Sequence, residues 1–297
     1  YSITNAAGNS TISAKLGGAG TLTKTGAGNL TMSGNNTYTG TTTLTAGTVI
    51  VDSNSSFGSG GTVVLNGSTL QSNGSHTVSN PLSLAVATTI SGSSDLALTG
   101  TLIQTGTNLT LTTSNTGNTT LGDVALSNAA NRTLTIAGAG NLTIGGNISD
   151  GGTATASALI MSGNGTLTLS GANTYGGTTT VNSGTLALGN NNVTKDSSAI
   201  TVAGGTLAIG DFSDTVGAVT LSSGSITGAN GTLSGSSYSI TNAAGNSTIS
   251  AKLGGAGTLT KTGAGNLTMS GNNSYTGTTT LTAGTVIVDS NSSFGSG

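Results

Sequence analysis

The feature that most constrains the fold of this chain is a short sequence motif that recurs at a regular interval. TTTVNSGTLALG at 178–189 is followed by AITVAGGTLAIG at 199–210, so that Leu186 recurs as Leu207. A further echo, AVTLSSGSIT at 218–227, follows at a slightly shorter interval. A local period of about 20 residues with strand-like content is typical of a solenoid, in which each turn of chain stacks on the one before.

The segments inside this period have the composition of β-strands. The stretches TLTI at 133–136 and TLTLS at 166–170 alternate polar and apolar residues, which is the pattern of a half-buried strand. β-Branched Thr suits the exposed positions of a pleated strand, and Gly and Asn separate the segments as tight turns require. Apolar residues do not recur at helical spacing, so the sequence predicts an all-β protein.

Two architectures fit these strands: a parallel β-solenoid with coils of about 20 residues, and antiparallel β-sandwich repeats. Asn66-Gly67 between two apolar segments is a hairpin signal and favours the sandwich. The equivalent tripeptide Thr45-Ala46-Gly47 adopts such a turn poorly, and the tripeptides share only small size, as coil corners require. The regular return also places like residues on like, which favours the solenoid. The positions expected to point inward and stack are Leu30, Leu44, Val49, Leu65, Leu70, Val181, Leu186, Val202 and Leu207.

A second, much longer repeat divides the chain. Residues 1–60 return at 238–297, and the only change is Thr37 to Ser274. We therefore expect one tandem unit of the β-solenoid at 1–237, with 238–297 as the start of the next unit, continuous with the first. Near-identity over such a length points to recent duplication, and to a parent protein built as a tandem array.

Composition excludes several functional classes. Charged residues make up 5% of the chain and none is Glu, so neither a basic nucleic-acid footprint nor an acidic tail is present in the sequence. The chain has no Cys, which leaves no disulfide and no thiolate metal site. Aromatic residues make up 3% of the chain, too few for a thick globular core but enough for a thin core of stacked aliphatic side chains.

Candidate catalytic groups are scarce. His76 is the sole histidine, and without a GxSxG elbow we interpret it as an exposed loop or strand residue rather than a general base. Asp211 and Asp214 are the closest carboxylate pair, and we interpret them as a polar loop at a coil corner. The glycine-rich stretches lack the Asp spacing of a solenoid calcium site. We expect no catalytic residue, no cofactor and no metal.

One long motif carries a family resemblance. The sequence GAGNLTMSGNNTYTGTTTLTAGTV at 26–49 resembles the autotransporter-associated β-strand repeat, and close versions occur at 163–186 and 263–286. The resemblance implies a right-handed parallel β-helix, and a passenger region of a type V secreted protein of Gram-negative bacteria. It further implies a location at the cell surface or outside the cell, with the parent protein anchored by an outer-membrane barrel that lies outside these residues.

The motif also predicts corner positions. Tyr38, Tyr175 and Tyr275 fall at the longer corner between two strands, where we expect them to plug the coil edge rather than to stack on a ligand. Asn35 and Asn36 are expected to cap that turn through side-chain to backbone hydrogen bonds, or to form ladders between coils. The segments 147–155 and 189–198 are interpreted as loops bulging from the coil.

Two functions of different class follow. The first is a rigid, non-catalytic stalk of a surface protein, used in adhesion. The second is a direct binding module, whose polar Thr and Asn faces bind a host or neighbouring-cell surface, a glycan or another copy of the chain. Ice binding is a narrower variant, which the uneven coil spacing disfavours, and a surface hydrolase has no visible catalytic group. No nucleic-acid partner is expected.

Overall fold

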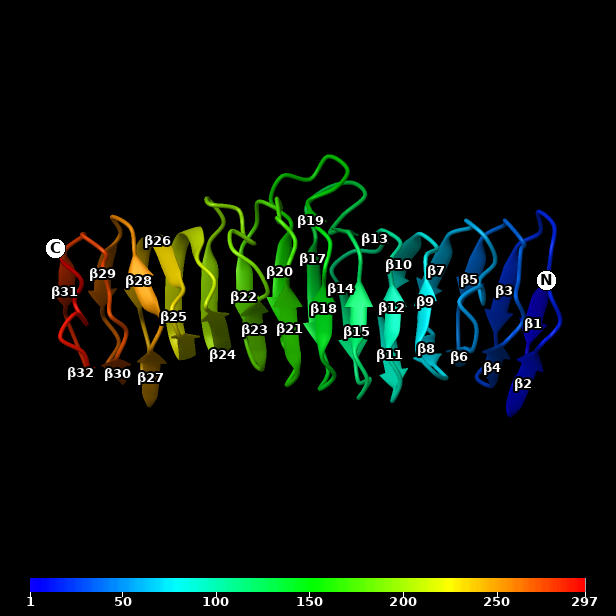
Figure 1. The fold of residues 1–297 in the computed structure, drawn as a ribbon, viewed down its shortest axis with the longest axis horizontal. Coiled ribbons are helices and arrows are strands. Elements are labelled where there is room, and N and C mark those ends of the chain that lie inside the picture. The colour runs from blue at the N-terminus through cyan, green and yellow to red at the C-terminus, as the bar shows by residue number, and fades with distance from the viewer. Residues whose placement is uncertain (297) are drawn as a thin grey trace.

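A computed structural model describes residues 1–296 of the chain. Throughout this range the regular elements are β-strands, which stack as a β-solenoid of about 14 turns. Figure 1 shows the resulting rod, with the two termini at opposite ends. Each strand pairing recorded between coils is parallel. The predicted all-β solenoid is therefore confirmed, and the antiparallel β-sandwich alternative is wrong.

Each coil passes along three faces of the rod, which are named here the first, second and third face in chain order. The first face consists of β1 (Ser2–Thr4), β3 (Leu22–Thr25), β5 (Thr42–Leu44), β7 (Val63–Asn66), β10 (Leu82–Val86), β13 (Leu102–Gln104), β16 (Val124–Ala125), β19 (Ile148–Ser149) and β28 (Lys252–Gly254). The second face contains β2 (Asn9–Ile12), β4 (Asn29–Met32), β6 (Thr48–Val51), β8 (Thr69–Ser72), β11 (Thr88–Gly92), β14 (Leu109–Thr113), β17 (Thr133–Ala137), β20 (Ala158–Met161), β22 (Thr179–Val181), β29 (Thr258–Lys261) and β31 (Thr279–Leu281).

The third face contains β9 (His76–Val78), β12 (Leu96–Leu98), β15 (Thr119–Leu121), β18 (Leu142–Ile144), β21 (Thr166–Leu169), β23 (Thr185–Leu188), β27 (Asn246–Ile249), β30 (Asn266–Met269) and β32 (Thr285–Val288). Three longer strands turn corners without a break. β24 (Ile200–Gly210) covers the second and third faces, β25 (Asp214–Gly228) covers all three, and β26 (Thr232–Ile240) covers the first and second. Since β26 crosses position 237, the coil stack continues through the boundary between the two repeat units.

Coil length varies along the rod, as the numbering of paired residues shows. Leu30 of β4 pairs with Val49 of β6, so this coil is slightly shorter than the predicted period. Leu134 of β17 pairs with Leu159 of β20, so the coils near the middle of the rod are longer. The extra residues lie in corner loops, which rise above the rod near the middle of Figure 1. The longer corners in this region separate strands that still stack in register.

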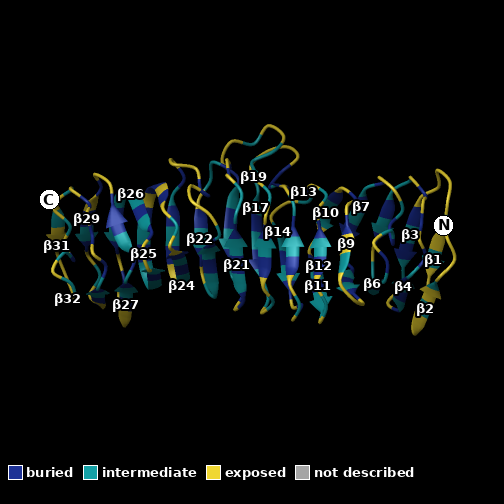
Figure 2. Cartoon of the chain, in the orientation of Figure 1, coloured by how far each residue is buried: buried dark blue, intermediate teal, exposed yellow. Residues whose placement is uncertain are grey.

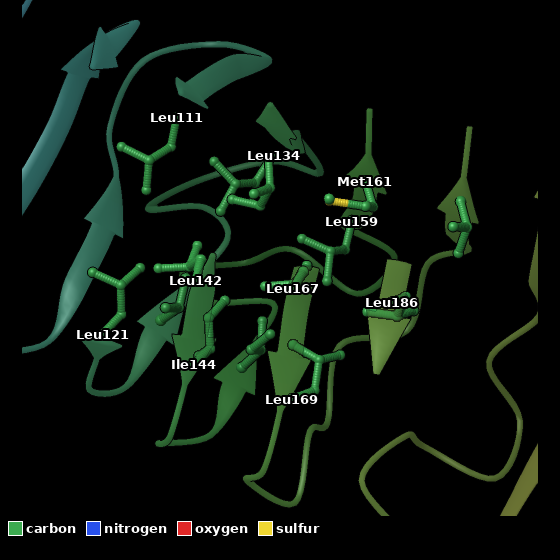
Figure 3. Close-up of a cluster of buried hydrophobic side chains, with 14 of the residues drawn as sticks. Leu111, Leu121, Leu134, Leu142, Ile144, Leu159, Met161, Leu167, Leu169 and Leu186 are labelled. Atoms are coloured by element: carbon green, nitrogen blue, oxygen red, sulfur yellow. The ribbon is translucent and has the colours of Figure 1, made fainter. Parts of the chain in front are cut away.

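The core is a set of aliphatic columns that run along the rod axis. Alternate residues of nearly every strand are buried, and Figure 2 shows this dark band inside a rim of exposed corners. Figure 3 shows two facing rows, with Leu134 and Leu159 of the second face opposite Leu142 and Leu167 of the third. Because each coil is too thin to bury these side chains alone, burial depends on the coils above and below.

Glycine permits the coils to approach at the corners. A Cβ built at Gly34 would lie 2.3 Å from the carbonyl oxygen of Ala14 in the preceding coil. Gly47 has a φ of +70°, which L residues with a side chain adopt only with strain, and its Cβ would lie 2.4 Å from the oxygen of Gly28. Side chains at these positions would push neighbouring coils apart.

The two copies of the long repeat occupy different faces. The first copy places β3 on the first face and β4 on the second, whereas their equivalents in the second copy, β29 and β30, lie on the second and third. The second-face line β4–β6–β8–β11–β14–β17–β20–β22–β24–β25–β26–β29 contains eleven coil-to-coil steps. One repeat unit therefore spans eleven turns plus one face, and the same sequence is displayed one face further round the rod.

Two predicted loops differ from expectation in part. Segment 147–155 begins with β19, whose Ile148 is buried, so the projecting loop is 150–157 rather than the whole segment. Segment 189–198 contains no strand, as expected of a loop, yet Val193 and Thr194 within it are buried. The first face continues through this segment by backbone hydrogen bonds, such as that from Asn173 N–H to the Val193 carbonyl oxygen at 3.0 Å.

Candidate functional site

The predicted core residues lie inside the rod. Leu30, Leu44, Val49, Leu65, Leu70, Val181, Leu186, Val202 and Leu207 are all buried, each at 1% exposure or less. Leu44 pairs with Leu65 on the first face, and Leu186 pairs with Leu207 on the third. Val181 pairs with Val202 on the second face. These side chains bind coils together and are not accessible to a ligand.

The three motif tyrosines are buried at a corner. The hydroxyl of Tyr38 is hydrogen-bonded to Thr42 Oγ1 at 2.7 Å, and the Tyr275 hydroxyl to Thr279 Oγ1 at 2.8 Å. The Tyr175 hydroxyl is bonded in the same way to Thr179. Burial raises the pKa of Tyr175 to about 12, against the lowering effect of that hydrogen bond. Because the rings are buried, they plug the coil edge and offer no face for ligand stacking.

An asparagine beside each tyrosine bridges three coils. Asn36 accepts a hydrogen bond from Leu16 N–H at 2.9 Å, and donates from Nδ2 to the Ser56 carbonyl oxygen at 2.9 Å. Asn173 and Asn273 make the same two contacts with their own neighbouring coils. The expectation that Asn36 caps its own turn is therefore wrong. The side chain instead links the coil before to the coil after, and this ladder is the expected alternative.

Two lysines, Lys24 and Lys261, are buried in the rod, and the sequence pattern was not interpreted to place a charged residue there. Lys24 lies inside the rod, and Nζ donates to the carbonyl oxygens of Thr25 at 2.9 Å and Gly26 at 2.7 Å. Lys261, its equivalent, also contacts corner carbonyls. Burial lowers the pKa of both ammonium groups. The available signal was the strand alternation, which places Lys24 at an inward position.

The two candidate carboxylates are not a pair. Asp211 is exposed at a corner and accepts a hydrogen bond from Asn230, as a corner loop residue would. Asp214 is the first residue of β25 and is buried, so its interpretation as a polar loop residue is wrong. Its Oδ2 accepts hydrogen bonds from the N–H and hydroxyl of Thr194, while Oδ1 has no partner. Burial raises the pKa of Asp214 to about 6.

His76 lies in β9 and is half-buried. Its ring nitrogens contact the Asn73 carbonyl oxygen at 2.9 Å and Asn54 Oδ1 at 3.3 Å. The ring thus contacts a backbone carbonyl of its own coil and a side-chain amide of the preceding coil. Among the described residues, no group of three or more His and Asp side chains is placed to hold a metal ion.

The accessible chemistry of the rod is a set of hydroxyl columns. On the second face, the outward residues Thr180, Thr201, Thr220, Ser239, Thr260 and Thr280 follow one another in register. The third face carries Thr166, Thr185, Thr206, Ser225, Thr248 and Thr268 in the same manner. Stacked strands place such hydroxyls about 4.8 Å apart. These columns form an uncharged surface of hydrogen-bonding hydroxyl groups along the C-terminal part of the two faces.

The parallel coil stack, with its buried core and polar columns, defines a β-solenoid scaffold. Three segments, 22–51, 159–188 and 259–288, match the family model described as Passenger-associated-transport-repeat. The resemblance to an autotransporter passenger repeat region is thus confirmed at the positions where the motif predicted it. No curated protein and no solved structure matches the chain. No helix of the described residues is long and apolar enough to cross a membrane.

Proposed function

We propose that the chain is a rigid, non-catalytic stalk within a secreted autotransporter passenger, located at the cell surface or outside the cell. The observation that carries the proposal is the unbroken coil stack, in which the inward side chains of the coils between the two ends are buried. About 14 turns at about 4.8 Å each give a rod of about 65 Å. Because each coil packs its inward side chains against those of the next coil along the axis, such a rod is stiff, as a spacer requires.

The stalk is tested by a distance distribution between its ends. Since the chain has no native Cys, a double variant Thr23→Cys/Thr280→Cys accepts two spin labels at defined outward positions. A rigid rod predicts a single narrow distance, which is unchanged when the ionic strength rises. A broad or multimodal distribution would contradict a stalk. The double variant Thr201→Cys/Thr260→Cys, with both labels inside the rod, is the control. Its distance distribution gives the width expected for a stiff stretch of coils.

A second candidate function is direct binding through the hydroxyl columns. The specific observation in its favour is the register of Thr180, Thr201 and Thr220 on one flat face. Regularly spaced hydroxyls offer many weak contacts to a glycan, a cell surface or another copy, and repetition multiplies them by avidity. Beads that carry the chain should then bind cells or glycans, and the double variant Thr201→Glu/Thr220→Glu should abolish binding. Equal binding by that variant would leave only the stalk.

A further inference from the structure

Four asparagines in the chain are followed directly by glycine, the sequence in which an asparagine side chain deamidates most readily. The main-chain nitrogen of the next residue attacks the side-chain amide, and a glycine, which has no Cβ, hinders this attack least. The four are Asn66, Asn73, Asn164 and Asn230, each at or beside a corner of the rod. Because the dipeptide is the same in all four, the folded structure decides which of them can react.

Three of the four glycines have a hydrogen-bonded N–H. Gly74 N–H donates to Ser94 Oγ at 3.2 Å. The N–H groups of Gly165 and Gly231 donate to carbonyl oxygens of the preceding coil, each at 3.2 Å. The attacking nitrogen at these three corners is therefore held by a neighbouring coil, and its hydrogen bond must break before it can approach the amide.

The asparagines at these three corners are held as well. The side-chain amide of Asn73 donates to Asp52 Oδ1 at 2.9 Å, and that of Asn230 donates to Asp211 Oδ1 at 2.7 Å. Asn164 is held through its main chain, because its N–H donates to a carbonyl oxygen of the preceding coil at 2.8 Å. Each of these corners is thus fixed by two contacts that oppose the reaction.

The corner of Asn66 and Gly67 differs on both counts. Asn66 is the last residue of β7, and its side chain is half-buried on the outward side of the strand. Within the described residues, neither the Asn66 side chain nor the Gly67 N–H has a hydrogen-bond partner. Gly67 is exposed, has a φ of +97°, and a Cβ built there would meet no atom closer than 3.5 Å. The peptide group between the two residues therefore has room to turn.

We propose that Asn66 is a site of spontaneous deamidation in the folded rod, and that hydrogen bonds protect the other three asparagines. The Gly67 nitrogen loses its proton and bonds to Cγ of Asn66, while the bond from Cγ to the side-chain nitrogen breaks and ammonia leaves. Water then opens the five-membered imide at either carbonyl carbon, which gives aspartate or isoaspartate. The chain thus gains a water, loses an ammonia and acquires one negative charge.

Either product changes the first face of the rod. Aspartate adds a charge to the outward side of a chain in which charged residues make up 5%. Isoaspartate also lengthens the main chain by one carbon at the corner between β7 and β8. The register between β7 and β10 is already irregular opposite Asn66, where Val86 is the partner. Since the released ammonia diffuses away, the modification accumulates with the age of the rod.

Peptide mapping of the full chain by mass spectrometry tests the proposal. The folded chain is incubated in a mildly alkaline buffer, sampled over time and digested at acidic pH. Asn66 should deamidate faster than Asn73, Asn164 and Asn230, by up to about tenfold for each hydrogen bond that the slower sites must break. In denaturant the four rates should converge. A folded chain in which Asn66 is no faster than the other three, or an equal lead of Asn66 in denaturant, would overturn the proposal.

A release variant tests whether hydrogen bonds give the protection. Asp52→Ala/Ser94→Ala removes the acceptors of the Asn73 amide and of Gly74 N–H. The rate at Asn73 should rise toward that of Asn66, while the rate at Asn66 stays at the wild-type value. An unchanged rate at Asn73 in the folded variant would contradict the proposed protection.

Two further variants complete the experiment. Asp211→Ala frees the side chain of Asn230 at a distant corner, and should raise its rate even if the first variant fails to fold. Asn66→Gln lengthens the side chain by one carbon, which disfavours the five-membered ring, and should abolish the reaction at this position. Circular dichroism checks that each variant keeps the β-fold. Acidic product at position 66 of Asn66→Gln, formed as fast as in the wild type, would show that Gly67 is not the attacking group.

Discussion

Single residues inside the rod differ between the repeats in a coordinated way. In the first copy, Lys24 donates to the Gly26 carbonyl oxygen, and Ala46 occupies the next corner. In the middle copy, Met161 takes the place of the lysine. There Ser183, the equivalent of Ala46, donates from its hydroxyl to the oxygen of Gly163 at 3.1 Å. The same corner carbonyl is satisfied by a buried ammonium in one copy and by a hydroxyl in the other.

This difference predicts what happens when the residues of the middle copy replace their equivalents in the first copy. Lys24→Met/Ala46→Ser should raise Tm at pH 7, because it removes a buried charge and retains a donor for the carbonyl. In a protein of this size, each kcal/mol gained raises Tm by about 2–4 °C. Burial lowers the pKa of Lys24, so the cost of its charge falls as the pH rises toward 10.5. The gain in Tm should therefore shrink at high pH, as thermal melts from pH 7 to pH 10 would measure.

The single variant Lys24→Met is the matched control, because it removes the charge but leaves the Gly26 carbonyl without its donor. It should be less stable than the double variant by about 1–3 kcal/mol, the cost of an unsatisfied buried polar group. Equal stability of the two variants would show that Ser183 does not replace the lysine.

Asp214 gives the rod a predicted pH dependence. Its pKa rises from 3.8 in the unfolded chain to about 6 in the folded rod because the carboxyl is buried. The folded state then binds the proton more tightly, so stability should increase as the pH falls from 7 through 6 toward 4. Asp214→Asn should raise Tm at pH 7 and flatten this dependence. Melts in which Asp214→Asn keeps the wild-type slope would contradict this assignment.

At the scale of the strand and its corner, the sequence pattern was informative about strands and less so about what joins them. Polar and apolar residues alternate along the strands, and this alternation predicted that Leu30 and Val49 point inward. The recurrence of the motif after one coil predicted that Leu186 stacks on Leu207. The bridging role of Asn36 depends on contacts with the coils on both sides, which residue type alone does not reveal. Asp214 was misplaced because a carboxylate in a Gly- and Ser-rich stretch resembles a loop residue.

Corner glycines provide a test at this scale. Gly34→Ala should destabilise the rod by about 1–3 kcal/mol, because the new methyl group meets the Ala14 carbonyl oxygen of the preceding coil. Gly20→Ala is the matched control, since a Cβ at Gly20 meets nothing within 4 Å. Chemical denaturation of the two variants measures the difference, and equal midpoints would show that the corners tolerate side chains.

At the scale of the whole molecule, the structure adds a property that the sequence pattern did not reveal. Because one unit spans eleven turns plus one face, the near-identical stretches 1–60 and 238–297 appear on different sides of the rod. The period of about 20 residues predicts about twelve coils in a unit, but the additional face could not be read from the sequence, since the coils near the middle are longer. The rod, its strands and its repeats were predicted, while the rotation between repeats required the register of every coil.

The central claim is that each coil stacks in parallel on the next, and crosslinking of engineered cysteines tests it most directly. Thr185 and Thr206 are register partners on neighbouring coils, whereas Thr185 and Ser225 lie two coils apart. A short thiol crosslinker matched to the spacing of about 4.8 Å between neighbouring strands should join the first pair and not the second. Efficient crosslinking of Thr185→Cys/Thr206→Cys, with none in Thr185→Cys/Ser225→Cys, is the predicted result. Failure of the first pair, or equal crosslinking of both, would contradict the stack.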